Sequence, residues 1–248
     1  MSEVNPFPLP APVFRGESRV VEAGNAFEWL RQGWTLFVSQ PAQWLAVTVV
    51  LLLVMLAVSI VPLIGALAAN LLTPVFMAGM LHACRRAVNG ETPEIGDLFA
   101  GFNRGTGNLV VLGLIYMVGM FCIFLITLAV GGGGVVGGMM AGSPAGIGLA
   151  FGGVALAMVL SVVLSLPLFM AMWFAPALVF FNQMNPVDAM KSSFGACVKN
   201  VLPFLVYGLI VLVLAFFAAL PLFLGFLVLL PVVFGSIYIA YRDIFVAD

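Results

Sequence analysis

Very few side chains in this chain of 248 residues could do chemistry. His82 is the only histidine, and Cys84 follows it two positions later. Imidazole and thiolate are zinc ligands, but a zinc site needs three or four of them. Cys122 and Cys197 are isolated elsewhere, without a CxxC spacing. We therefore expect no metal site, no catalytic residue and no cofactor, and interpret His82 as a half-solvated side chain at a membrane surface.

Asn70 is the other candidate functional residue. It is the deepest strongly polar side chain of an apolar run, and Thr73 and Pro74 follow it. An asparagine inside a membrane either bonds a neighbouring helix or contacts a substrate. Asn70 and His82 are therefore the two polar candidates for a functional site.

Residues 132–137 match GxGxxG in form. A dinucleotide site also needs a preceding strand and an acid about 20 residues later, and neither is predicted here. We expect residues 131–148 to form a glycine-rich outer loop that leads into close helix packing. A re-entrant or gating segment is the alternative.

The composition indicates which class of protein these residues belong to. Hydrophobic residues make up 63% of the chain, charged residues 8%, and the mean hydropathy is +1.21. A soluble domain carries about 25% charged residues. We predict an all-α integral membrane protein with the lipid bilayer as its surroundings. The net charge of −1 argues against nucleic acid as a partner.

Apolar runs of about 20 residues each predict six transmembrane helices. The first pair, near 43–61 and 63–84, is divided at Pro62 and Gly65. The third and fourth lie near 109–130 and 150–176, with a kink expected at Pro167, and the last pair fills residues 201–241. All nine Lys and Arg residues then fall on one side, so the positive-inside rule predicts both termini in the cytoplasm.

The polar segment 185–200 repeats an earlier one. It aligns without a gap to a segment 160 positions before it, so that Asp188 and Lys191 match Glu28 and Arg31. A weaker third copy begins at Thr92. Each copy predicts an amphipathic cytoplasmic surface helix before a membrane hairpin, and the first two carry an acid–base pair three residues apart. The repeat favours a structural role for Asp188 and Lys191 over a catalytic one.

We accordingly divide residues 23–248 into three pseudo-repeats within one membrane domain: unit one 25–84, unit two 92–181 and unit three 185–242. Prolines recur in residues 1–22, which are expected to form a disordered, proline-rich cytoplasmic tail. This segment lacks the pattern of a cleavable signal peptide.

The opening "WLRQGWTLF" at 29–37 and the later "FAPALV" at 174–179, followed by Pro186, Ala189 and Ser193, carry a resemblance. The chain resembles a broad group of uncharacterised bacterial multi-pass inner-membrane proteins. It is distantly similar to the membrane domain of some glycerophosphodiesterases. The resemblance implies a bacterial inner membrane and supplies no catalytic residues.

Three functions remain open at this stage. The first is a non-enzymatic membrane scaffold, assembly or envelope-homeostasis factor that works through membrane-protein partners, self-association or lipids. The second is a carrier or channel for a small neutral or lipidic solute. A membrane enzyme is the least favoured, because no nucleophile with a base is visible.

Overall fold

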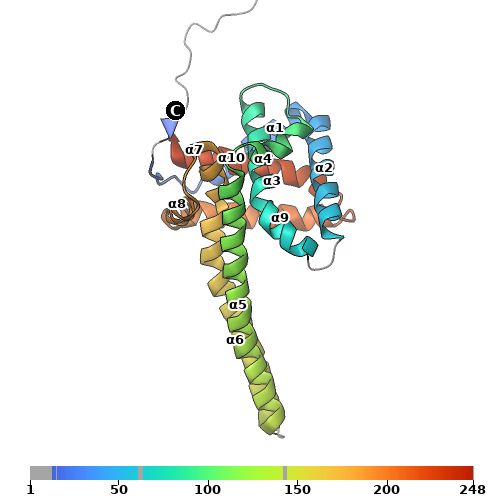
Figure 1. Ribbon diagram of the computed structural model, residues 1–248, viewed down its shortest axis with the longest axis vertical. Helices are drawn as coiled ribbons and strands as arrows, with labels where there is room; N and C mark the ends of the chain where they lie inside the picture. Colours follow the sequence, from blue (N-terminus) through green and yellow to red (C-terminus); the bar gives the residue numbers. More distant parts are fainter. Residues whose placement is uncertain (1–12, 15, 61–63, 142–143, 248) are drawn as a thin grey trace, which may run out of the picture. The chain divides into compact units, whose positions relative to one another are not determined.

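The computed structural model describes residues 13–14, 16–60, 64–141 and 144–247, and almost all of them are helical (Figure 1). The helices and short strands are β1 (Val13–Phe14), α1 (Asn25–Ser39), α2 (Pro41–Ser59), α3 (Ile64–Val88), the 3-10 helix η1 (Ile95–Phe99), α4 (Ala100–Asn103), α5 (Thr106–Ala141), α6 (Pro144–Trp173), α7 (Ala175–Asn182), α8 (Pro186–Lys199), α9 (Val201–Ala219), α10 (Phe226–Phe245) and β2 (Val246–Ala247).

Six helical segments in the described part of the chain are long and apolar enough to cross a membrane: residues 41–59, 67–88, 106–141, 145–182, 201–219 and 226–245. The predicted all-α multi-pass class is confirmed. The division between the first two spans also lies where expected, because α2 ends at Ser59 and α3 begins at Ile64.

The described chain forms two compact bodies. Of the described residues, those up to 54, 77–100 and 195–247 form the first body, and those within 55–76 and 101–194 form the second. Neither body is a run of consecutive residues. The compact bodies therefore do not coincide with the three consecutive units expected from the repeats.

In the first body, α1 packs closely on α10. A Cβ atom placed on Gly33 would lie 2.5 Å from the carbonyl oxygen of Val232 and 2.8 Å from the amide nitrogen of Ser236. Only glycine allows two helix backbones to approach this far. Ser236 is also bonded to Tyr207 of α9, with 2.7 Å between the hydroxyl oxygens. A glycine contact and a buried hydrogen bond thus join three helices.

The second body contains a hairpin in which α5 and α6 lie side by side (Figure 1). The expectation of a glycine-rich outer loop at residues 131–148 is wrong, because residues 131–141 continue α5 and residues 144–148 begin α6. Gly134 explains the difference, since a Cβ atom there would lie 2.6 Å from the Cα atom of Gly153. Close helix contact outweighs the low helix propensity of glycine.

The fourth predicted span is interrupted at Phe174, a break that was not predicted from the sequence, whereas the kink was expected at Pro167. The helix α6 is continuous through Pro167 and ends at Trp173, and α7 starts at Ala175. In an unbroken helix the Phe174 amide would donate to the Met170 carbonyl, but the hydroxyl of Ser193 lies between these two groups. It accepts a bond from the Phe174 amide at 2.9 Å and donates to the Met170 carbonyl at 2.8 Å. A side chain inserted into the backbone ladder is an established cause of a helix break.

Part of the segment expected to be a disordered tail is ordered. β1 pairs antiparallel with β2, so Val13 lies opposite Ala247 and Phe14 opposite Val246. Further on, the Val21 amide donates to the Asn200 side chain at 2.8 Å. The disorder expected at residues 1–22 is therefore wrong for those that the structure describes, whereas residues 1–12 and 15 lie outside the description. The two described ends of the chain lie side by side.

Candidate functional site

His82 lies in an ionic cluster near the end of α3. Its Nε2 atom is 3.7 Å from a carboxylate oxygen of Asp97, and its Nδ1 atom is 3.4 Å from a guanidinium nitrogen of Arg85. Asp97 belongs to η1 and is almost completely buried. The sequence pattern alone does not predict that His82 lies close to the Asp97 carboxylate.

Arg86 is the centre of this cluster. Its guanidinium donates to both oxygens of Asp97, at 3.0 and 3.2 Å, to Glu91 at 2.9 Å and to Glu94 at 3.1 Å. The second oxygen of Asp97 also accepts the Glu94 amide at 2.8 Å, which completes a capping box at the start of η1. Since all three nitrogens of the guanidinium meet a carboxylate, the cluster fastens η1 to α3.

A second polar centre surrounds Asp243 near the end of α10. Its carboxylate accepts hydrogen bonds from the Asn25 amide and the Trp29 indole, each at 2.8 Å, and forms an ion pair with Arg19. The cap position of α1 is Gly24, and the Asn25 side chain turns to Asp243. One carboxylate therefore holds α1, α10 and the N-terminal segment together.

An open cavity of about 260 Å³ lies beside this centre, between α1 and α10. Its walls are mostly polar, with Trp29 and Ile239 as the apolar members; the remaining lining residues are Asn25, Glu28, Gln32, Arg242 and Asp243. Because both signs of charge are present, the cavity suits a small polar molecule better than a hydrocarbon chain.

Asn70, in α3, belongs to the second body and is exposed. A Cβ atom on Gly113 of α5 would lie 3.1 Å from the Asn70 carbonyl oxygen and 2.7 Å from that of Leu71. The backbone of this segment is therefore packed against α5, whereas the Asn70 side chain is not enclosed. The two candidates from the sequence, Asn70 and His82, lie in different bodies.

The surface helices α1 and α8 bury the same positions of their shared pattern. On α1, Ala26, Trp29, Gly33 and Phe37 are buried; on α8, Pro186, Ala189, Ser193 and Cys197 are buried at the matching positions. Large apolar side chains remain exposed on both helices, again at matching positions: Phe27, Trp34 and Val38 on α1, and Val187, Phe194 and Val198 on α8. Exposed aromatic and aliphatic side chains on a polar helix are typical of a helix that lies in a membrane interface.

The predicted acid–base pairs differ in strength. Arg31 donates two bonds to Glu28, both at 2.8 Å, and the Gln32 amide adds a third at 2.6 Å. These bonds, from Arg31 first, lower the pKa of Glu28 to about 2. The second pair is loose, with 3.8 Å between Lys191 Nζ and Asp188 Oδ1. Lys191 therefore keeps more capacity than Arg31 for binding an external anion.

All three cysteines are free thiols. Cys84 and Cys197 are buried and Cys122 is exposed. Among the described residues, no group of three or more His, Cys, Asp and Glu side chains is placed to hold a metal ion. His82 is near carboxylates, but its neighbour Asp97 pairs with Arg86 instead of turning to a shared metal position.

Sequence reasoning missed three residues that organise these sites: Asp97, Ser193 and Asp243. Each is a single acid or hydroxyl whose side chain bonds a different helix or segment from its own. Asp243 could have been noticed as the only acid in the segment 201–245. Ser193 belongs to the segment that carries the family resemblance, which gave no indication of its hydrogen bonds, and Asp97 carried no comparable signal.

One curated protein is similar over most of the chain. It is a probable inner membrane protein of Burkholderia thailandensis, 33% identical over 203 residues, and the alignment covers 79% of this chain and 75% of that protein. The chain matches no known family model, and no solved structure matches it. The similarity supports the bacterial inner-membrane part of the resemblance and does not bear on its glycerophosphodiesterase part.

Proposed function

The chain belongs to the same family as the probable inner membrane protein of Burkholderia thailandensis. From this premise we propose that it is a non-enzymatic scaffold or assembly factor of the bacterial inner membrane, with a role in envelope homeostasis. The observation that carries this proposal is the α5–α6 hairpin. It offers a long apolar surface to other membrane components, including further copies of the chain.

The length of the hairpin is the first part of the argument. Its helix α5 has 36 residues, which is about 54 Å at 1.5 Å per residue, against about 30 Å for the hydrocarbon core. Residues 105–184 contain no charge. An uncharged hairpin of this length must tilt strongly in the bilayer or extend beyond it, and an apolar extension is stabilised when another protein covers it.

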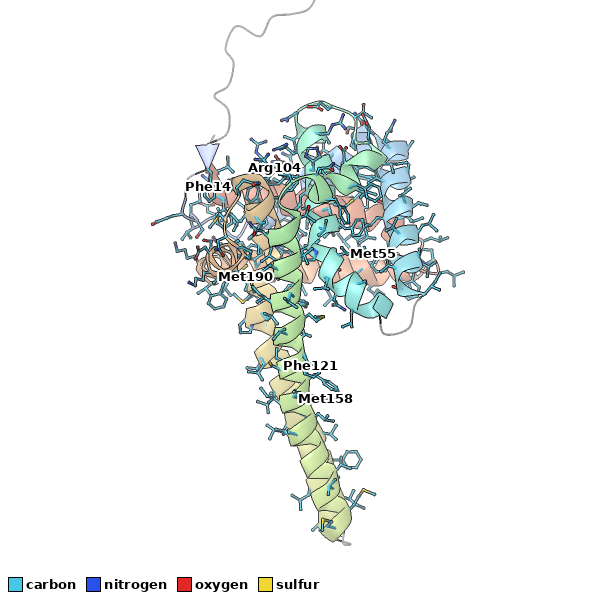
Figure 2. All side chains as sticks on the ribbon, viewed as in Figure 1. Phe14, Met55, Arg104, Phe121, Met158 and Met190 are labelled. Carbon is cyan, nitrogen blue, oxygen red and sulfur yellow. The ribbon has the colours of Figure 1, made fainter. Side chains whose placement is uncertain are left out.

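The surface of the hairpin is the second part. Glycine contacts hold the two helices together on the inside, while large apolar side chains cover the outside. Figure 2 shows Phe121 and Met158 projecting from it, and Met140 and Phe151 nearer the tip are 83% and 74% exposed. Long unbranched and aromatic side chains adapt to different partners and suit an assembly role.

We test this role with a photo-crosslinking residue in place of Phe151, and with Leu209 of α9 as the matched control. Leu209 is also exposed, but its helix has only 19 residues and fits an ordinary span. We expect a discrete protein adduct at 151 and lipid adducts at 209. Lipid adducts alone at both positions would contradict the scaffold role.

The orientation belongs to the same proposal. Pairing of β1 with β2 supports both described ends on one membrane face, and the nine basic residues favour the cytoplasm for that face. In a variant without native cysteines, a cysteine at Glu22 should react only from the cytoplasmic side and one at Met140 only from the opposite side. Labelling of both from one side contradicts the arrangement.

A carrier for a small neutral or lipidic solute is the second candidate. The polar cavity beside Asp243 and the membrane asparagine Asn70 favour it. Reconstituted vesicles should then show solute flux that decreases in an Asn70→Ala or Gln32→Ala variant. Flux that depends on these side chains would favour the carrier over the scaffold.

A further inference from the structure

We propose that α8, together with the flanks of α5 and α6, forms a binding site for one anionic phospholipid. The acyl chain occupies an apolar hollow and the phosphate lies against Lys191. This site is independent of the proposed scaffold role, because it involves a different surface from the hairpin tip and is tested by a different measurement.

The hollow has the character of a lipid groove. It lies wholly in the second body, has a volume of about 320 Å³ and is open at the surface. Its wall is apolar except at one position, with lining residues Ile115, Ala171, Val187, Met190, Lys191 and Phe194. Figure 2 labels Met190 on α8. A groove with an apolar wall and a single cation at its edge matches a lipid that has an anionic headgroup.

The position of the hollow in the chain fits the depth of such a lipid. The helix α8 joins the span that ends at Asn182 to the one that begins at Val201, so it lies at the end of two membrane spans. Ile115 lies nine residues after Thr106, the first residue of α5, which is about 14 Å along the helix. The hollow therefore connects a headgroup position on α8 with the apolar flank of a span.

The positive charge at the hollow favours a lipid with an anionic headgroup. The charged residues of the second body in its described ranges are Arg104, Asp188 and Lys191, and only Lys191 lines the hollow. Its ion pair with Asp188 is long, at 3.8 Å, and its side chain is 74% exposed. The ammonium therefore keeps donors for a phosphate that also carries a negative charge, whereas a zwitterionic headgroup has less to gain.

The equivalent cation on α1 provides a matched control. Arg31 is as exposed as Lys191, but both of its bonds go to Glu28 at 2.8 Å, and it does not line the hollow of the second body. If general attraction of basic side chains to the membrane surface explained lipid retention, the two cations would behave alike. If binding in the hollow explains lipid retention, only substitution of Lys191 should reduce it.

The experiment uses the full-length protein in neutral detergent, mixed with equal amounts of phosphatidylglycerol and phosphatidylcholine, with retained lipid counted by native mass spectrometry. We expect one preferentially retained phosphatidylglycerol. Lys191→Gln should reduce its retention about fivefold relative to phosphatidylcholine, and Arg31→Gln should leave it unchanged. Ala171→Leu, which fills the hollow, should reduce retention of both lipids.

Two results overturn the proposal. One is equal loss of phosphatidylglycerol in the Lys191→Gln and Arg31→Gln variants, or no loss in either. The other is a dimer without bound lipid that Ala171→Leu converts to a monomer, because a second copy of the chain would then cover the hollow. Unchanged thermal unfolding of Lys191→Gln confirms that the variant is folded, so an effect on lipid retention is interpretable.

Discussion

The indole nitrogen of Trp29 donates a hydrogen bond of 2.8 Å to the carboxylate of Asp243, 214 residues further along the chain. The Trp29 ring also packs on Phe204, with 5.6 Å between the ring centroids. A single side chain from the first surface helix thus contacts both helices of the last membrane hairpin, and its polar and apolar parts each have a partner.

Loss of the Asp243 carboxylate should destabilise the first body. Asp243→Ala leaves the Trp29 indole, the Asn25 amide and Arg19 without their common acceptor, which should cost about 2 kcal/mol or more. Thermal unfolding in mild detergent measures the change. Asp188→Ala is the control, because its exposed pair at 3.8 Å should contribute less than about 1 kcal/mol. Similar losses in both variants would refute the special role of Asp243.

The Ser193 hydroxyl should matter more than its neighbour. Ser193→Ala removes the hydroxyl that accepts from the buried Phe174 amide and donates to the Met170 carbonyl, at a cost of about 1–3 kcal/mol. Ser192→Ala, one residue away and only half-buried, should be nearly neutral. The comparison is made on unfolding midpoints of the two purified variants. If α6 and α7 instead join into one helix in Ser193→Ala, the midpoint would not fall.

Substitution of two adjacent glycines of the hairpin by alanine should have different effects on stability. A methyl group at Gly138 would overlap the carbonyl oxygen of Gly146, so Gly138→Ala should destabilise the contact between α5 and α6. A methyl group at Gly137 would meet no heavy atom within 4 Å, so Gly137→Ala should be neutral or stabilising by up to about 1 kcal/mol. Equal effects in thermal unfolding would mean that the glycine contact does not hold the hairpin together.

The Glu28–Arg31 pair predicts a pH dependence. The folded pKa of Glu28 is lowered from 4.5 to about 2, chiefly by hydrogen bonds from Arg31. The folded pKa lies below the unfolded one, so the contribution of the pair is present above pH 4.5 and is lost as pH falls to about 2. Wild type and Arg31→Gln should differ slightly in thermal midpoint at pH 6 and converge near pH 2. Because both side chains are exposed, added salt should also reduce the difference. A difference that grows towards low pH would exclude this pair as its source.

Several features could be predicted from local patterns alone. The number of spans follows from apolar runs that exceed the thickness of a bilayer, and the pairs Glu28–Arg31 and Asp188–Lys191 follow from helical spacing. The exposed positions of α1 and α8 are not explained by periodicity alone. On the predicted amphipathic helix α1, Phe27, Trp34 and Val38 are exposed whereas Leu30 and Phe37 are buried, because one side meets α10 and the other does not.

By itself, the amino-acid sequence determined that the chain is a multi-pass helical membrane protein, since burial of apolar runs in a bilayer depends on composition and length. Only the tertiary structure decided where those helices end. Gly134 and Gly138 are weak helix formers in isolation and remain helical because α6 lies against them; Ser193 breaks the helix before Phe174 because α8 brings its hydroxyl to that turn. The same holds for Asp97 and Asp243, whose partners become neighbours only after packing. Propensity acts between residues close in sequence, whereas close contacts and buried hydrogen bonds depend on distance in space, and here the contacts in space decide.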